Sequence, residues 1–378
     1  MVSPQHIHPP PNVFAGVPGT RMPSIIGKIP HQPEKPIEVK PDDPLFVAED
    51  KADLPPLIAF YGSASATTWL EDRYLIWRGE GTTSDNPKVQ GYLKYNHHAF
   101  AWGDPLCLET KEARKAVAEE MVAWAKKKHL HLVWCCVTEE FAEVLAEGVN
   151  GVGWSTLSCI QEDVLHPATV KLDSHDVKHN IRRAQKESVN VEELRLWEPD
   201  FMPDPKTKQI IEEGIEAWRA NRKGRQIASA SLLPWLDANN RRYYVARVPG
   251  KIVGLCILSP IAHDSYQIKN AIAFPDAPKG TSELLLSRVI DEMRAEGKNG
   301  LTFGTSAMSE LHPEANLGGW RVNMMKKGYR MINKKTGLNK RAEFRAKFES
   351  EQEPLYVCFP PHGFGWSGVL ALMKMMRA

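Results

Sequence analysis

The chain has 378 residues, of which 42% are hydrophobic and 25% charged, as in globular proteins long enough for two domains. The net charge of +2 excludes a chain that is polybasic or polyacidic as a whole, and the absence of any run of about 18 apolar residues excludes a predicted membrane-spanning helix. The six cysteines lack zinc or redox spacing and residues 1–11 lack a secretory apolar stretch, which favours a cytoplasmic protein that holds no metal.

The first part of the chain divides into an arm and a folded unit. Residues 1–53 hold 11 of the 28 prolines and almost no hydrophobic periodicity, which predicts a flexible arm. Short apolar runs then predict strands at Leu57–Tyr61, Tyr74–Trp77, Gly91–Tyr95 and Ala99–Trp102. Helical periodicity behind a capping threonine and the patterns that follow predict a helix over Thr110–His129, a strand over Leu130–Val137, a helix over Glu139–Glu147 and a strand over Gly153–Leu165.

The second part of the chain repeats this order. The pattern predicts a hairpin around Pro249-Gly250, then a strand, a helix and a strand, at Arg242–Arg247, Ile252–Ile261, Tyr266–Phe274, Thr281–Glu296 and Leu301–Gly304. A turn motif precedes the long helix in each half, Gly103-Asp104-Pro105 in the first and Pro275-Asp276-Ala277-Pro278 in the second. We therefore expect an internal duplication, with one lobe over residues 54–165, a second over 166–358 and a tail over 359–378.

Hairpin, strand, helix and strand is the core order of the acetyltransferase-type fold, so the sequence predicts tandem α/β units of this GNAT-like type. Users of coenzyme A in this fold present backbone N–H groups to the pyrophosphate at the start of the long helix. Here Pro275 and Pro278 lack that donor, and Asp276 places a negative charge in the turn. This argues against acetyl-CoA, and the turn is alternatively a tight loop whose Thr281 caps the helix.

Basic residues are concentrated near the C-terminus. Ten Lys or Arg and one acid lie between Asn316 and Lys347, which leaves the rest of the chain net acidic. Paired cations with interleaved aromatic residues are typical of a surface that binds a nucleic-acid backbone. The predicted contacts are Lys334, Lys335, Lys340, Arg341, Arg345 and Lys347. A predicted helix within Asp173–Val189 adds Lys178, Arg182 and Arg183, although such a stripe is alternatively an ordinary solvated face.

The tail from Phe359 ends in a short apolar helix led by a tryptophan. Trp366, Leu370 and Met373 fall on one face of that helix at spacings of four and three. Such a face is typical of a helix at a membrane interface. The alternative, that the helix packs onto the body of the protein, stays open at this point.

Five segments, in order, resemble the catalytic domain of the phosphatidylglycerol lysyltransferases, a family of aminoacyl-tRNA-dependent lipid-aminoacylating enzymes. They are Ala101–Cys107, Lys178–Ala184, Phe274–Thr281, Phe303–Ser309 and Phe344–Phe348, within about residues 57–360. The resemblance implies tandem acetyltransferase-type folds that use aminoacyl-tRNA as co-substrate, with no acetyl-CoA and no metal. Bacterial members add a multi-spanning module that this sequence does not show, so the chain is more similar to the freestanding fungal sterol-aminoacylating enzymes.

The resemblance implies transfer of an amino acid, with glycine favoured, from tRNA to the 3β-hydroxyl of a membrane sterol such as ergosterol. The expected partners are glycyl-tRNA, the sterol, a membrane surface contacted peripherally from the cytoplasm, and a synthetase acting in trans. The reaction needs oxyanion donors, for which Ser306, Thr305 or backbone N–H groups near Gly304 are candidates. Asp276 is a candidate base or ammonium ligand, and Asp104 of the first-half turn is a further catalytic candidate. The alternatives are a phosphatidylglycerol, protein or peptide acceptor, or a non-catalytic RNA-binding module on the same fold.

Overall fold

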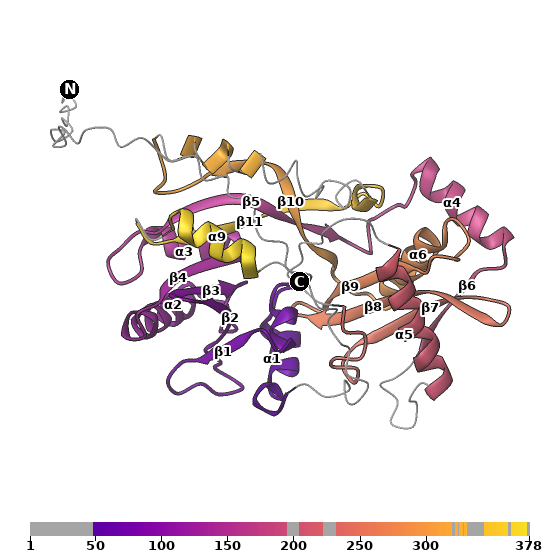
Figure 1. Cartoon of the computed structure of the whole chain (residues 1–378), viewed down its shortest axis with the longest axis horizontal. Coiled ribbons are helices and arrows are strands. Elements are labelled where there is room, and N and C mark those ends of the chain that lie inside the picture. The colour runs from indigo at the N-terminus through magenta and orange to yellow at the C-terminus, as the bar shows by residue number, and fades with distance from the viewer. Residues whose placement is uncertain are drawn as a thin grey trace. The chain divides into compact units, whose positions relative to one another are not determined.

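A single eleven-stranded mixed sheet runs through the described part of the chain (Figure 1). The computed structural model describes residues 48–194, 204–221, 232–319, 322–323, 325–327, 329–330, 344–361 and 364–375. The strand order is β1-β2-β3-β4-β11-β5-β10-β9-β8-β7-β6. The strands are β1 Leu75–Arg78, β2 Val89–Tyr95, β3 His98–Trp102, β4 His131–Val137, β5 Ser155–Leu165, β6 Asn190–Leu194, β7 Arg242–Val248, β8 Lys251–Ile261, β9 Ser265–Ala273, β10 Leu301–Pro313 and β11 Glu351–Phe359.

The same five-element unit occurs twice along the chain. In the first unit β1, β2 and β3 pair antiparallel, helix α2 (Lys111–Lys127) crosses over, and β4 pairs parallel to β3. In the second, β7, β8 and β9 pair antiparallel, helix α6 (Thr281–Ala295) crosses over, and β10 pairs parallel to β9. The predicted duplication is present, and the predicted tandem acetyltransferase-type α/β architecture is confirmed.

The two units are joined by an exchange of strands at the centre of the sheet. Strand β5, which follows the first unit, pairs with β10 of the second unit. Strand β11, from the C-terminal part, pairs with β4 of the first unit and with β5. The central order β4-β11-β5-β10 therefore alternates between early and late segments of the chain. Polar residues from distant parts of the sequence meet at this point.

Helices cover the sheet on both of its faces (Figure 1). Strand β3 has apolar side chains on both faces, because successive residues of a strand point to opposite sides of the sheet. Phe100 and Trp102 belong to one hydrophobic core, and Ala99 and Ala101 belong to the other. Helices α2 and α3 (Glu139–Glu147) pack on the alanine side. In the second half, α4 (His175–Lys186) and α6 share one core, and α5 (Pro205–Ala220) packs in another.

The predicted strand at Leu57–Tyr61 is wrong, because Leu54–Tyr61 form helix α1. A short apolar run fits a strand or a buried helix equally well, and Pro55 in the first turn lacks only an N–H that a helix leaves unpaired there. Leu57 and Ile58 are buried whereas Phe60 is 70% exposed. The other predicted strands and helices agree with the structure within a few residues, except that β10 extends to Pro313.

The two ends of the sequence have different outcomes. The predicted arm over residues 1–53 lies mostly outside the described residues, which begin at residue 48. Within the described end of this arm, Glu49–Lys51 form the short helix η1. The predicted tail helix is α9 (Trp366–Met375), which packs against β2 and β3. Ala371 is buried in the core, and Leu372 and Met375 pack against that core. No helix in the described ranges has the length and apolar character needed to cross a membrane.

Candidate active site

A polar bulge lies at the centre of the sheet, where β10 and β9 stop pairing. Those strands pair only at Leu301 and Thr302, and the register of β10 against β5 shifts between Thr302 and Thr305. Gly304 occupies the bulge with a φ of 71°, a conformation that favours glycine. Its N–H donates to Thr302 Oγ1 at 2.8 Å, and Thr302 Oγ1 donates to Glu162 Oε1 at 2.7 Å. The bulge thereby joins the second unit to β5.

Arg345 fixes this bulge from the segment that precedes β11. Its Nη1 donates to Asp163 Oδ2 at 2.8 Å and to the carbonyl oxygens of Gly304 and Thr305 at 3.0 and 3.2 Å. The side chain of Asp163 is fully buried, and that of Arg345 is 15% exposed. The structure therefore places this predicted tRNA contact inside the protein, as the partner of a buried carboxylate.

A second set of polar contacts joins β9 to the N-terminal part of the chain. Gln267 and Lys269 lie two residues apart on β9 and so share one face of the sheet. Lys269 Nζ donates to Thr67 Oγ1 at 3.1 Å, and Thr67 also hydrogen-bonds the Gln267 side chain. Thr67 lies in the short helix η2 (Ala66–Leu70) and is buried. A residue before the first strand thus positions a lysine of the second unit.

The surroundings of Lys269 favour its neutral form. Burial is the largest effect and lowers the pKa of Lys269 to about 7. The positive charges of Arg241 and Arg73 lower this pKa further, whereas the negative charges of Glu71 and Asp237 raise it. A lysine that is about half neutral at neutral pH can accept a proton, which an ordinary surface lysine cannot.

Glu162 is the second titratable group of this junction. Burial raises the pKa of Glu162 to about 7, and the hydrogen bond from Thr302 opposes that increase. The negative charge of Glu353 raises the pKa further, and the positive charge of Arg345 lowers it. Perturbed titratable groups at the junction of two units are typical of functional sites.

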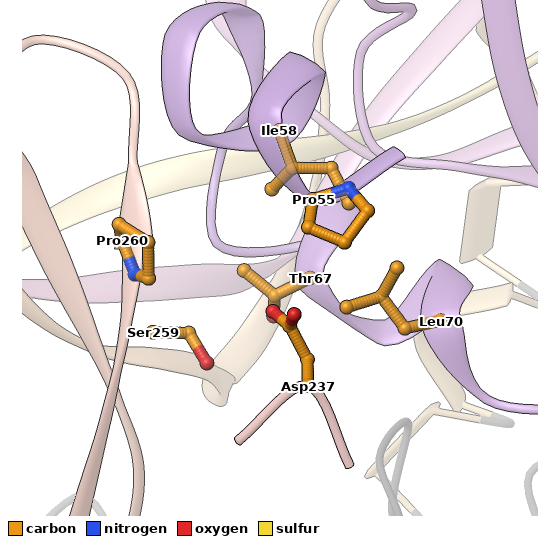
Figure 2. A pocket seen from close by; sticks show the side chains of 7 residues that line it. All are labelled: Pro55, Ile58, Thr67, Leu70, Asp237, Ser259 and Pro260. Atoms are coloured by element: carbon orange, nitrogen blue, oxygen red, sulfur yellow. The ribbon is translucent and has the colours of Figure 1, made fainter. Parts of the chain in front are cut away.

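A small cavity lies between α1, η2 and β8, and Thr67, the hydrogen-bond partner of Lys269, is one of its lining residues (Figure 2). Its volume is about 10 Å³, which is space for about one water molecule. The lining residues are Pro55, Ile58, Thr67, Leu70, Asp237, Ser259 and Pro260. Figure 2 shows Asp237 and Ser259 together on one side of this space, with Pro55, Ile58 and Leu70 around the rest. The cavity therefore has one polar and one apolar side.

None of the four predicted catalytic residues lines this cavity. Ser306 is buried beside the bulge, where its Oγ has no hydrogen-bond partner among the described residues, and Thr305 adjoins it. Asp104 accepts hydrogen bonds from the N–H and the Oγ1 of Thr138, the N-cap of α3, at 2.9 and 2.6 Å. Burial raises the pKa of Asp104. The structure thus gives Asp104 a helix-capping contact, and a catalytic role for any of these residues stays a prediction.

Asp276 lies in an open groove between α4 and the turn before α6, where it forms an ion pair with Lys251. The groove is open to solvent and has a volume of about 320 Å³. Its lining residues are Arg183, Lys186, Glu187, Asp276, Pro278 and Lys279. Gly280 lies where α4 and the start of α6 come together. Its φ is 91°, and a Cβ at this position would lie 2.0 Å from the carbonyl oxygen of Asn180 on α4. The close approach of α4 to α6 therefore requires glycine here.

The predicted tRNA contacts are divided by the structure. Arg183 lines the groove, Arg182 is exposed beside it, and Lys178 is exposed and paired with Asp173 at 2.8 Å. Lys347 lies over the ring of Phe344 with Nζ 5.9 Å from the ring centroid. The predicted contacts that lie outside the described residues are Lys334, Lys335, Lys340 and Arg341. The groove brings Lys186 and Lys279 to Arg183, so that three cations from two segments line it together with the two acids.

The predicted lipid contacts lie on α9. Leu370 is 46% exposed and Met373 is partly buried. Trp366 is the first residue of the helix, and the structure describes its backbone alone. The buried Ala371 shows that α9 is a packing helix along its inner side. Its outer side remains available for a further contact.

Sequence reasoning missed the residues around the cavity. Lys269 is the one charged residue in the sequence of β9, which is the local signal that could have identified it. Asp237 lies in a turn before β7, where a polar residue is unremarkable, and only the fold brings it to Ser259 on β8 and Thr67 on η2. No spacing rule links residues so far apart.

The comparisons with known proteins place the chain in one family. The model described as "Phosphatidylglycerol lysyltransferase, C-terminal" matches residues 58–359. The structure resembles the C-terminal domain of a protein named as a lysylphosphatidylglycerol synthetase from Agrobacterium fabrum, with 17% identity, 82% of this chain and 90% of that chain covered, and a TM-score of 0.63. It also resembles L-PGS from Bacillus licheniformis, with 14% identity, 86% of this chain and 98% of that chain covered, and a TM-score of 0.65. A third similar structure is FemX, with 9% identity, 85% of this chain and 97% of that chain covered, and a TM-score of 0.51. No curated protein matches the chain.

Proposed function

The chain belongs to the phosphatidylglycerol lysyltransferase C-terminal family and is an aminoacyltransferase, and we propose that it moves an amino acid from aminoacyl-tRNA onto the 3β-hydroxyl of a membrane sterol. Glycine is the favoured amino acid and ergosterol the favoured acceptor, as in the fungal ergosteryl-3β-O-glycine synthase. The observation that carries the proposal is the contact between Lys269 and Thr67, which holds a lysine of near-neutral pKa where the two units meet.

The reaction is a transesterification in which Lys269 carries the proton. The neutral amine of Lys269 takes the proton of the acceptor hydroxyl as that oxygen bonds to the ester carbonyl carbon. The tetrahedral intermediate then loses the ribose oxygen of the tRNA 3′ end, which receives the proton from the Lys269 ammonium. One ester bond forms and one breaks, so the step needs no other reactant. Thr67 holds the Nζ of Lys269 in place.

The oxyanion of the intermediate needs donors that are already in position. Ser306 and Thr305 remain the proposed donors, because the Ser306 hydroxyl is buried beside the bulge without a partner among the described residues. Arg345 holds the carbonyl oxygens of Gly304 and Thr305 and so fixes the backbone that carries these hydroxyls. Its proposed role is therefore positioning.

A lipid acceptor is supported by exposed apolar side chains. Helix α1 lines the cavity with Pro55 and Ile58 and exposes Phe60 to solvent. Leu370 of α9 is also exposed, and α1 and α9 contribute to the same core. An exposed aromatic side chain suits a protein that must approach a hydroxyl at a membrane surface. Peripheral membrane contact through these two side chains is part of the proposal.

This contact predicts an effect on vesicle binding without an effect on folding. Replacing Phe60 and Leu370 together with glutamate should lower the affinity for sterol-containing vesicles about tenfold or more, because each buried apolar side chain contributes about 1.5–3 kcal/mol. The matched control replaces the exposed Leu108 and Val152 with glutamate. Vesicle co-sedimentation and the melting temperature are measured for both. Equal loss in both variants would contradict a specific membrane surface.

The groove of Arg183, Lys186 and Lys279 is the proposed contact for tRNA phosphates. Its cations come from α4 and from the turn before α6, so they converge on one open space rather than follow a single helix face. Each phosphate contact releases counterions, which makes the affinity dependent on salt. Asp276 forms an ion pair with Lys251 and lies among these cations. Its proposed role is to hold the cationic side chains of the groove in position.

Charge reversal in the groove should weaken tRNA binding. Arg183→Glu with Lys186→Glu is expected to lower tRNA affinity about tenfold or more and to reduce the slope of log affinity against log salt by about two. Lys126→Glu with Lys127→Glu is the matched control, because both pairs lie in the last turn of a helix and change the charge equally. Filter binding over a salt series measures both. An identical loss in the control would refute the groove.

The proposed function is tested with purified protein, glycyl-tRNA carrying labelled glycine, and vesicles that contain either sterol or phosphatidylglycerol. Transfer of label to the sterol, followed by lipid chromatography, is the expected result. Label on phosphatidylglycerol instead would favour the phospholipid acceptor. Retained tRNA binding with no labelled lipid in any vesicle would favour the non-catalytic RNA-binding module.

A further inference from the structure

Lys269 lies at an irregularity of the sheet. Ile257 of β8 pairs with Asn270 and Leu258 pairs with Ile268, so Lys269 has no pairing partner in β8, which the structure describes in full. On the other side, the pairing of β9 with β10 ends two residues earlier. Such a bulge turns a side chain out of the regular alternation of the strand. The direction of the Lys269 side chain therefore depends on its own contacts more than on the sheet.

Thr67 provides the contact that holds Lys269, and its hydroxyl has only one hydrogen to donate. Two oxygen atoms compete for that hydrogen, the carbonyl oxygen of Ala64 at 2.8 Å and Oε1 of Gln267. Both acceptors draw the hydrogen away from Lys269, so Thr67 Oγ1 accepts from Nζ at 3.1 Å rather than donating to it. A neutral amine has one lone pair, and this arrangement keeps Thr67 from occupying it.

The amide of Gln267 is held between Thr67 and the bulge at Gly304. Gln267 is 9% exposed and belongs to the last pair that β9 forms with β10. A Cβ at Gly304 would lie 2.8 Å from Nε2 of Gln267, so glycine at this position leaves the space that the amide occupies. Gln267 thereby ties the Thr67 hydroxyl to the strand that carries Lys269.

We propose that Gln267 is a positioning residue, which fixes the direction of the Thr67 hydroxyl and so keeps the lone pair of the Lys269 amine available for the proton of the acceptor hydroxyl. The inference rests on the proposed function, because it assigns a role in the proton transfer by Lys269. It adds to that function a residue that acts on the base and does not touch the substrate.

A neutral side chain is needed at residue 267. The charged groups that face Lys269 are Arg241, Arg73, Glu71 and Asp237. The two arginines lower the pKa of Lys269 and the two acids raise it, while burial, the largest effect, lowers it to about 7. A carboxylate at residue 267 would add a negative charge near the lysine and favour its ammonium form. Glutamine accepts the same hydrogen from Thr67 without that charge.

Gln267→Glu keeps the acceptor but adds a charge. The pH at which the transfer rate is half-maximal should therefore rise by about one unit, which lowers the rate at pH 7 about fivefold and leaves kcat at high pH unchanged. The KM for aminoacyl-tRNA should not change. Rates over a pH series measure both quantities.

Gln267→Met removes the acceptor without adding a charge. The midpoint of the pH profile should stay near 7, and kcat on the plateau should fall about tenfold, because the Thr67 hydroxyl loses one of the two acceptors that direct it. The KM for aminoacyl-tRNA should again be unchanged. Gln267→Asn, whose shorter amide does not reach as far, replaces Gln267→Met if that variant does not fold.

A role through Thr67 predicts that the two residues are coupled. Thr67→Val removes the hydroxyl and keeps the shape of the side chain, and Gln267→Met should cost nothing further in that background. Thr67→Ser keeps the hydroxyl and should retain most of the wild-type rate. Gln209→Glu is the matched control, because Gln209 is exposed on α5 and the variant adds the same charge. It should leave the midpoint and kcat unchanged.

The titration of Lys269 is also measured on the protein without substrate. NMR of the protein with 13C-labelled lysine follows the amine directly, and Lys269→Met identifies its signal. Gln267→Glu should raise the midpoint of this titration by about one pH unit, and Gln209→Glu should not change it. A purely structural role for Gln267 would lower the melting temperature without moving this midpoint.

The outcomes separate this inference from the proposed function. An unmoved Lys269 midpoint in Gln267→Glu, or full activity in Gln267→Met, would overturn the positioning role. A loss in Gln267→Met that is equally large in the Thr67→Val background would also overturn it, because Gln267 would then act by another route. Transfer to a lipid without these effects would leave the proposed function standing alone. The NMR shift in a protein that transfers to no lipid would support the action of Gln267 on Lys269 and remove the lipid acceptor.

Discussion

Replacing Lys269 with methionine is expected to lower kcat about a hundredfold or more, on the order of 2.7 kcal/mol of activation free energy. The neutral Nζ of Lys269, positioned by Thr67, is the proposed acceptor of the hydroxyl proton, and methionine has no basic atom. The folded protein should not lose stability, because burial disfavours the lysine charge and methionine has no charge to bury. Single-turnover transfer and thermal unfolding are measured on the same preparation.

The pH dependence identifies the group. Only the neutral amine can act as base, so the wild-type rate should rise with pH through about 7 and then level off. The charges facing Lys269 are those of Arg241, Arg73, Glu71 and Asp237, and they are unchanged in a Lys269→Arg variant. Arginine keeps the positive charge but does not deprotonate, so this variant should be as inactive as methionine if Lys269 is a base. Retained activity in Lys269→Arg would assign an electrostatic role instead.

Glu162 is the control for this profile, because burial also raises its pKa to about 7. The inflection should persist in Glu162→Gln if it belongs to Lys269. Loss of the inflection in Glu162→Gln would transfer the titration to the carboxyl group.

Arg345→Ala is expected to reduce the free energy of unfolding by about 3–5 kcal/mol, the cost of leaving a buried charge without its partner. The Asp163 side chain is fully buried, and Arg345 also donates to the carbonyl oxygens of Gly304 and Thr305. Removing Arg345 therefore leaves a carboxylate and two carbonyl oxygens to be satisfied by water. Urea unfolding monitored by tryptophan fluorescence measures the loss.

Two further variants separate stability from RNA binding. Lys347→Ala, two residues along and in contact with the ring of Phe344, should cost only about 0.5–1 kcal/mol. Arg345→Met combined with Asp163→Leu should recover part of the stability, because removing both charges leaves neither unpaired. If Arg345→Ala unfolds like the wild type but binds tRNA more weakly, Arg345 is a surface contact, as the run of basic residues in the sequence predicted.

The sequence by itself determined the order of elements and the repetition of that order. Strand and helix periodicities depend on neighbouring residues, so β2, β3, α2 and β4, and then β7, β8, β9 and α6, were predictable from local pattern. The family resemblance also followed from short contiguous segments. The prediction from local pattern was wrong at Leu54–Tyr61, because a short apolar run has no periodicity that distinguishes a buried helix from a buried strand.

The tertiary structure alone decided which polar residues meet. Thr67, Asp237 and Ser259 belong to three separate segments that meet at one cavity, and Lys269, from a fourth segment, is hydrogen-bonded to Thr67. The same holds for Arg345, a cation that reads as surface charge until the exchange of β5 and β11 places it against Asp163. Burial and charge partners are properties of the assembled sheet. The sequence therefore identifies which residues are able to titrate, but their protonation states and roles depend on long-range contacts that no local pattern contains.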